Sequence, residues 1–126
     1  MSKRKLVMVS GGFDPIHIGH IKLIEEASKH GDVIVALNSD EWLIKKKGYA
    51  FMNWSERKYI MSNIKGVKKV VSFDDSSGTA CDAIETYTPD YFANGGDRYI
   101  KNTPEILTCK KLGVETIWFV GGGKVQ

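Results

Sequence analysis

The chain has 126 residues, of which 42% are hydrophobic, enough for one buried core and too few for two ordinary domains. Its formal net charge of +3 is spread along the sequence, apart from basic clusters at residues 3–5 and 45–47, which argues against a nucleic-acid partner. The apolar run near the start is too short for a signal peptide or a membrane span, so we expect a cytoplasmic protein with no membrane partner.

The first half of the chain alternates short apolar runs with segments that have helical features. Residues 6–10 are an apolar run closed by two glycines, which predicts a buried strand. Residues 18–30 place apolar side chains at helical spacing with charged ones between them, so they predict a helix with Gly31 as its C-cap. A second buried strand is expected over residues 33–37, and residues 53–64 open with a capping box that predicts another helix.

The second half continues the same alternation. Residues 67–73 predict a third strand, and residues 79–87 open with the spacing of a capping box and predict a helix. Residues 91–93 predict a brief strand that ends at an Asn-Gly-Gly turn. Residues 103–113 begin with an N-cap threonine and a proline at the first helical position, and a last strand is expected over residues 115–120.

Strands that alternate with helices and lack polar alternation imply a parallel sheet that is covered on both faces and joined by right-handed crossovers. We therefore predict an α/β fold in which residues 1–126 form a single doubly wound, Rossmann-like domain with a parallel sheet of about five strands. Ligands of such sheets bind beyond the carboxyl ends of the strands. The loops at that end, which should face one crevice, hold residues 11–12, 38–40, 94–98 and 121–124.

The segment GGFDPIHIGH, residues 11–20, joins the first strand to the first helix. Backbone N–H groups and the positive end of the helix can converge there on phosphate oxygens, and the two leading glycines let the backbone come close. His17 and His20 are three residues apart and can point the same way, where two imidazoles can donate hydrogen bonds to developing charge. Two histidines alone would more often cap and pack a helix, but a glycine-rich turn at a strand end favours a phosphate site.

The pattern GxFDxxHxGH resembles the HxGH signature of the nucleotidylyltransferase superfamily. The resemblance continues in matching order through Asn38-Ser39-Asp40, the lysines before Gly48, Ser55-Glu56-Arg57, Val70-Val71-Ser72-Phe73, Pro89-Asp90 and Gly95-Gly96-Asp97. These motifs are similar to the adenylyltransferase domain of the bacterial heptose-phosphate enzyme, and the spacing from Asp40 through Lys46 to Arg57 also resembles glycerol-3-phosphate cytidylyltransferases. Both resemblances imply one reaction, in which a nucleoside monophosphate moves from a triphosphate onto a phosphorylated sugar or polyol and pyrophosphate is released.

The resemblance also implies roles for individual residues. His17 and His20 would be catalytic, holding the triphosphate and stabilising the transition state, and Lys46 would be a mobile lysine that reaches the α-phosphate. The nucleotide-binding residues that it implies are Gly11, Gly12, Phe13, Arg57, Gly95, Asp97 and Lys124. Asp40 and Lys46 would contact the acceptor. Without the resemblance, residues 45–47 would be a solvated loop, Arg57 would pair with Asp40 or Glu56 on the surface, and residues 95–98 would be a plain turn.

The implied mechanism is in-line attack by a phosphate oxygen of the acceptor on the α-phosphorus, with Mg²⁺ bridging the oxygens of the leaving pyrophosphate. The attacking oxygen is already ionised, so we expect no general base, and we expect Asp14 with Pro15 to cap the first helix. No metal ligands are expected on the protein, since Cys81 and Cys109 lack the spacing of a zinc site. The resemblance implies a homodimer, and the motifs favour ATP with a sugar 1-phosphate over CTP with a polyol phosphate.

Three alternatives remain beside this interpretation. Related proteins carry a serine- and threonine-rich phosphate loop and a final helix after the last strand, whereas this sequence stops at Gln126, so we expect these parts to be missing. A nucleotide-binding module without turnover is therefore the alternative from another class. An RNA-binding fragment of an aminoacyl-tRNA synthetase is disfavoured because no KMSKS-type lysine loop is visible. A pyridine-nucleotide adenylyltransferase is supported by residues 12–15 and by little that follows them.

Overall fold

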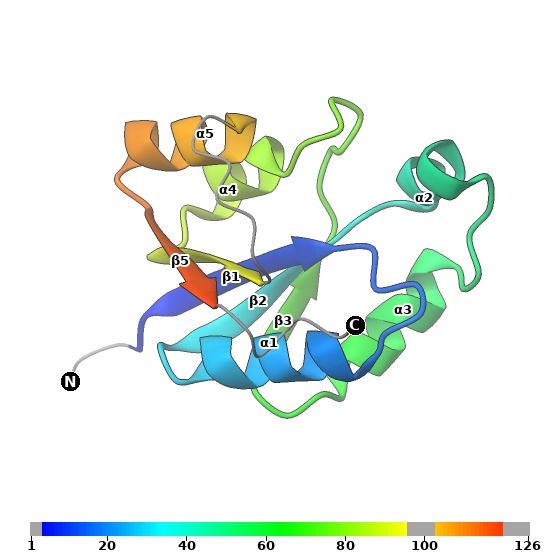
Figure 1. Cartoon of the computed structure of the whole chain (residues 1–126), viewed down its shortest axis with the longest axis horizontal. Helices are drawn as coiled ribbons and strands as arrows, with labels where there is room; N and C mark the ends of the chain where they lie inside the picture. The colour runs from blue at the N-terminus through cyan, green and yellow to red at the C-terminus, as the bar shows by residue number, and fades with distance from the viewer. Residues whose placement is uncertain (1–3, 96–102, 120–126) are drawn as a thin grey trace.

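Residues 4–95 and 103–119 are described by the computed structural model, and they build an α/β fold around one sheet (Figure 1). The strands are β1 (Leu6–Gly11), β2 (Asp32–Leu37), β3 (Val67–Val71), β4 (Tyr91–Gly95) and β5 (Glu115–Phe119). The helices are α1 (Ile18–Ser28), α2 (Asp40–Lys47), α3 (Trp54–Ser62), α4 (Cys81–Tyr87) and α5 (Pro104–Leu112). All neighbouring strands run parallel, which confirms the predicted doubly wound sheet of about five strands.

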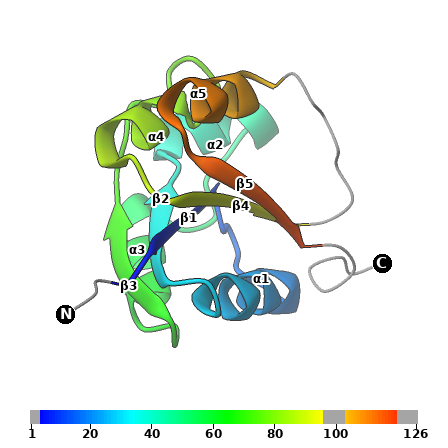
Figure 2. The same ribbon diagram turned by 90° about the vertical axis from the view of Figure 1, so that its left-hand side faces the viewer.

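The helices divide between the two faces of the sheet. α1 and α3 cover one face, and α4 and α5 cover the other (Figures 1 and 2). α2 belongs to neither layer and lies near the carboxyl ends of β1 and β2 (Figure 1). Across the described ranges, no helix combines the length and the apolar character that crossing a membrane requires.

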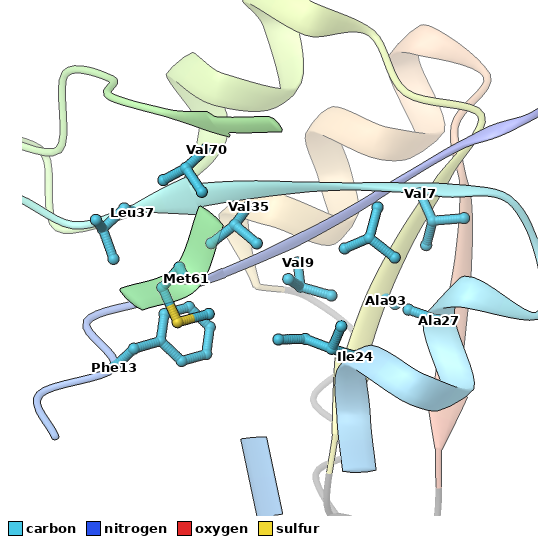
Figure 3. Packing of buried hydrophobic residues seen from close by; sticks show 11 residues of the cluster. Val7, Val9, Phe13, Ile24, Ala27, Val35, Leu37, Met61, Val70 and Ala93 are labelled. Carbon is cyan, nitrogen blue, oxygen red and sulfur yellow. The ribbon is translucent and has the colours of Figure 1, made fainter. Parts of the chain in front are cut away.

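Both faces of the sheet are buried because successive strand residues point to opposite sides. On the side of α1 and α3, Val7 and Val9 of β1 pack with Ile24 of α1 and Met61 of α3 (Figure 3). On the other side, Met8 belongs to a second cluster with residues of α4 and α5. A strand that must be apolar on both sides cannot alternate with polar residues, which explains the continuous apolar runs in the sequence.

The strand order β3-β2-β1-β4-β5 puts a topological switch point between β1 and β4. The chain leaves β1 through α1 to reach β2 on one side, and later enters β4 on the other side of β1. Val7 pairs in register with Tyr91, while Gly11 at the end of β1 pairs with Leu37 at the end of β2. The loops after β1 and β2 therefore leave from one edge, as predicted for residues 11–12 and 38–40. Residues 96–98 and 121–124 of the predicted crevice lie outside the described ranges.

The predicted C-cap of the first helix is wrong. α1 ends at Ser28 with Lys29 as its C-cap, so Gly31 lies outside the helix. A Cβ atom added at Gly31 would come within 2.2 Å of the carbonyl oxygen of Lys5, so close approach of two backbone segments is what requires glycine there.

One alternative and one further local prediction are wrong. Residues 45–47 form the last turn of α2 and are not a loop; Ser39 caps this helix by accepting a hydrogen bond from the backbone N–H of Trp42. The expected capping box at Thr79 does not form, because the helix begins at Cys81 and the Asp82 carboxylate instead accepts from the backbone N–H of Asp74.

Candidate active site

The histidine loop (residues 11–20) ends in a capping box made by its two histidines. His17 is the N-cap of α1, and its Nδ1 accepts a hydrogen bond of 3.0 Å from the N–H of Gly19. Nδ1 of His20 accepts a bond of 3.1 Å from the N–H of His17. A neutral imidazole that accepts at Nδ1 carries its proton on Nε2, so this network leaves an N–H donor at Nε2 of each ring. Helix capping and ligand binding are thus compatible uses of the same two side chains.

The two imidazoles are stacked, with ring centroids 3.8 Å apart and an angle of 24° between the rings. Phe13 meets His20 edge to face, with centroids 4.8 Å apart. Burial, followed by the repulsion that a protonated His17 would exert, lowers the pKa of His20 from 6.5 to about 4. His20 is therefore neutral near physiological pH and acts as a hydrogen-bond donor without a full charge.

Gly12 and Phe13 shape the loop beneath α2. A Cβ atom at Gly12 would lie 2.7 Å from Cδ2 of Leu43, so glycine here lets the Leu43 side chain of α2 pack directly on the loop. Phe13 has a φ of 49°, in the left-handed region that few side chains adopt, and its ring is buried in the core beside Met61 (Figure 3). Core packing therefore holds a strained backbone in the histidine loop.

Arg57 is buried, with only 1% of its surface exposed, and its guanidinium connects three segments. It donates to the carbonyl oxygens of Gly12 at 3.0 Å, Asn38 at 2.7 Å and Met52 at 3.0 Å. It also pairs with the Asp40 carboxylate at 2.6 Å. The structure contradicts the predicted contact between Arg57 and phosphate, because the guanidinium is enclosed and donates its hydrogen bonds to protein oxygens. The alternative of pairing with Asp40 holds, but inside the protein and not on its surface.

Asp14 does not cap the first helix, in contrast to the prediction. Its carboxylate accepts hydrogen bonds from the backbone N–H groups of Phe51 at 2.6 Å and Met52 at 2.8 Å. It also pairs with Nζ of Lys47 at 3.0 Å, and the Asp14–Pro15 peptide bond is cis. The N-cap position falls to His17 because the chain between the two residues is not helical.

Asp75 is a buried acid that the sequence interpretation missed. Its carboxylate accepts hydrogen bonds from the side-chain amide of Asn38 and from the backbone N–H and hydroxyl of Ser39. It thereby ties the loop after β3 to the start of α2. The two polar residues after the β2 apolar run were a visible signal, but nothing local connected them with an acid 36 residues away.

One face of α2 contacts the histidine loop, and another lines a pocket. Leu43 faces the histidine loop through Gly12, and Lys47 reaches Asp14. Five other α2 residues line a pocket of about 870 Å³ between this helix and the loop after β3. The pocket is lined by Ser39, Glu41, Trp42, Ile44, Lys45, Lys46, Phe73, Asp74, Asp75, Ser76, Ser77 and Gly78.

Lys46 is one of the residues that line this pocket. Its Nζ is 4.7 Å from the centroid of the Trp42 ring, in a cation–π contact. The ring also approaches the other side, since a Cβ at Gly12 would lie 3.5 Å from its Cζ3. Trp42 was not among the predicted site residues. Nothing in the sequence around it indicated that its ring would lie between Lys46 and Gly12.

The structure thus brings part of the predicted site together. His17, His20, Gly11, Gly12 and Phe13 form one loop, with Asp40 and Arg57 joined directly behind it. Gly95 is the last residue of β4, on the other side of the switch point. Asp97 and Lys124 lie outside the described residues. Within the parts of the chain that are described, no three histidine, cysteine, aspartate or glutamate side chains gather as a metal site would require.

A doubly wound parallel sheet with a glycine- and histidine-bearing loop at its switch point defines a Rossmann-like α/β domain of the kind that binds nucleotides. The family model described as cytidylyltransferase-like matches residues 8–120, and the chain belongs to this family. This confirms the resemblance on which the expected roles were based.

Two curated relatives are similar to the chain in sequence, and one solved structure is similar to it in fold. The bifunctional proteins HldE of Citrifermentans bemidjiense and Syntrophotalea carbinolica are both 34% identical to it, over 94% and 98% of this chain. The chain spans about a quarter of their length, 25% and 24%. A lipopolysaccharide core biosynthesis protein from Thermoplasma volcanium has a similar fold, with a TM-score of 0.73 and 24% identity over 93% of this chain and 95% of that one.

Replacing Arg57 with methionine should destabilise the fold by about 3–5 kcal/mol, because it removes a buried cation and leaves the Asp40 carboxylate and three carbonyl groups without their partner. Urea unfolding measures the change. The matched control is Lys58→Met, at an exposed position of the same helix, which should change stability by no more than about 0.5 kcal/mol. Equal effects of the two substitutions would contradict the role given to Arg57.

The free energy of unfolding should fall as the pH drops from about 6.5 to about 4. In this range His20 binds a proton in the unfolded chain but stays neutral in the folded one, because folding lowers its pKa. In His20→Gln the free energy of unfolding should fall less over this pH range, since glutamine does not titrate and can keep the capping box at the same helix position. Denaturant unfolding at a series of pH values compares the two proteins. Above about pH 7 the curves should run parallel; identical slopes below that would contradict the lowered pKa.

Proposed function

We propose that this chain is a nucleotidylyltransferase that moves the nucleoside monophosphate of a triphosphate onto a phosphorylated sugar and releases pyrophosphate. The observation that carries the proposal is the histidine capping box, which leaves two Nε2–H donors beside a glycine loop at a helix N-terminus. Membership of the cytidylyltransferase-like family supports the same reaction.

The triphosphate would lie along the histidine loop. Backbone N–H groups at the start of α1 and the imidazoles of His17 and His20 would meet its oxygens. Gly12 has no Cβ, so its backbone can come close to the phosphates while Leu43 of α2 packs against it. These groups are held in place before any ligand binds, since the capping box, the Phe13 ring and Arg57 fix the loop. Such preorganisation is what charge stabilisation requires.

The acceptor would occupy the pocket between α2 and residues 73–78. Its lining offers hydroxyls of Ser39, Ser76 and Ser77 and carboxylates such as Asp74 for the hydroxyl groups of a sugar, and an aromatic face at Trp42. Hydrogen bonds from Ser76, through its hydroxyl and then its backbone N–H, lower the pKa of Asp74, so this carboxylate is ionised and can accept from hydroxyls. Lys46, which also lines the pocket, would meet the phosphate group of the acceptor.

In the reaction, an ionised oxygen of the acceptor's phosphate attacks the α-phosphorus. A new P–O bond forms while the bond from the α-phosphorus to the oxygen bridging it to the β-phosphorus breaks, and that electron pair leaves with pyrophosphate. No proton has to be removed first, so no general base is assigned. The imidazoles of His17 and His20 and the ammonium of Lys46 would meet the charge that develops on the phosphate oxygens.

Mg²⁺ belongs to the proposal as a companion of the triphosphate, whose own oxygens would bind it. When bound, it neutralises charge on the phosphates, and no step above depends on it. ATP is preferred over CTP, and a sugar 1-phosphate over a polyol phosphate, on the resemblance of the motifs to the heptose-phosphate adenylyltransferase domain. A cytoplasmic location and a homodimer are proposed on the same resemblance.

The test is release of pyrophosphate from each of the four triphosphates in the presence of sugar or polyol phosphates. His17→Ala and His20→Ala should each lower the turnover at least about 10²-fold, because each removes a donor to the developing charge. The control is His30→Ala, which changes the remaining histidine at the other end of α1 and should leave the rate unchanged. Triphosphate binding without any pyrophosphate release would favour a nucleotide-binding module instead, and normal rates in the two variants would contradict the proposed site.

A further inference from the structure

We propose that Asp14 is a positioning residue, whose carboxylate fastens the last turn of α2 to the histidine loop and so fixes the place from which Lys46 acts. The inference rests on the proposed function, because it concerns how the loop and the lysine are held relative to each other. It gives a task to a carboxylate that neither caps a helix nor faces the pocket.

The contacts of Asp14 reach two segments that are distant in sequence. Its side chain is 0% exposed and accepts from the N–H groups of Phe51 and Met52 at 2.6 Å and 2.8 Å. Nζ of Lys47 lies 3.0 Å from the same carboxylate and donates to the Asp14 carbonyl oxygen at 2.6 Å. Four interactions therefore join the chain three residues before His17 to the end of α2 and to the segment that follows it.

This carboxylate is suited to hold structure and not to touch a substrate. Burial by itself would raise the pKa of Asp14, but the hydrogen bonds from Lys47, Phe51 and Met52 outweigh it and keep the pKa below its usual 3.8. The group is thus ionised, and its oxygens are already engaged by three donors. An enclosed, ionised and fully bonded carboxylate acts through the groups that it holds.

The geometry of α2 explains why this anchor, the set of contacts between Asp14 and residues 47, 51 and 52, matters for the position of Lys46. The helix has eight residues and covers neither face of the sheet, so core packing secures it only through Leu43. Its first turn is tied down by Ser39 to Asp75 and by Asp40 to Arg57. Its last turn has Lys47, one turn after Leu43 on the same side, and Lys46 is the next residue. Releasing Lys47 would let the last turn rotate or fray and move the Lys46 ammonium.

Pyrophosphate release by Asp14→Asn tests the inference, with nucleotide affinity measured alongside. We expect turnover to fall about 10²-fold with a smaller change in triphosphate affinity, because the lysine is misplaced while the histidine loop remains. In a Lys46→Ala background, Asp14→Asn should change the rate by no more than about twofold, since the residue through which it acts is already gone. An equal loss in both backgrounds would overturn the inference.

A second variant and a control keep the test decisive. Lys47→Met removes the other partner and should show the same dependence on Lys46, even if Asp14→Asn does not fold. The control is Glu26→Gln, which breaks a lysine–carboxylate pair with nearly the same separation, 2.9 Å, on the exposed surface of α1. It should leave the rate within about twofold of the unchanged protein. A loss of rate in the control equal to that of Asp14→Asn would overturn the inference.

Amide hydrogen exchange separates this inference from the proposed function. Asp14→Asn should speed exchange at Phe51, Met52 and the last turn of α2, and leave α1 and α3 protected. If the unchanged protein releases no pyrophosphate with any substrate pair, the proposed function fails, but faster exchange confined to these segments still supports the anchor. Unchanged exchange there would overturn the anchor whatever the activity.

Discussion

The site depends on one buried cation. The guanidinium of Arg57 joins the carbonyl oxygens of Gly12, Asn38 and Met52, one from each of three loops at the carboxyl edge of the sheet, and neutralises Asp40 at the start of α2. Parallel strands deliver these loops to one edge, but the sheet does not set the distances between them. A planar donor with several fixed N–H groups can do so, whereas a lysine could not. Loop geometry at this edge is therefore a consequence of one side chain in α3.

Around that cation, α2 divides the edge of the sheet into two regions. On one side lies the histidine loop, where helix capping through Nδ1 leaves an N–H donor at Nε2 of each imidazole. On the other side lies the pocket with hydroxyls, carboxylates and the Lys46 ammonium, a mixture suited to a phosphorylated sugar. Trp42 contacts both regions. The proposed reaction assigns one phosphorylated substrate to each region, with Lys46 on the pocket side of Trp42.

The sequence was sufficient for the layered fold and for the histidine loop, because apolar runs, glycine turns and the ten-residue motif are local signals. It misplaced the features that depend on contacts distant in sequence. Asp14 and Pro15 have the local pattern of a helix cap, but the Asp14 carboxylate accepts hydrogen bonds from backbone N–H groups about 37 residues later. Arg57 was expected at phosphate, and only the folded chain shows four protein oxygens around it. α2 could have been predicted from its cap at Ser39 and its charged ends.

The central claim is that two neutral imidazoles at the start of α1 point their Nε2–H groups at a triphosphate. Nitrogen NMR of the histidine side chains near neutral pH tests it most directly. The rings of His17 and His20 should carry their protons on Nε2, with Nδ1 as acceptor, and both Nε2 signals should move when ATP is added. His30, at the far end of α1, should not respond. Protons on Nδ1, or Nε2 signals that stay unchanged with every triphosphate, would contradict the account.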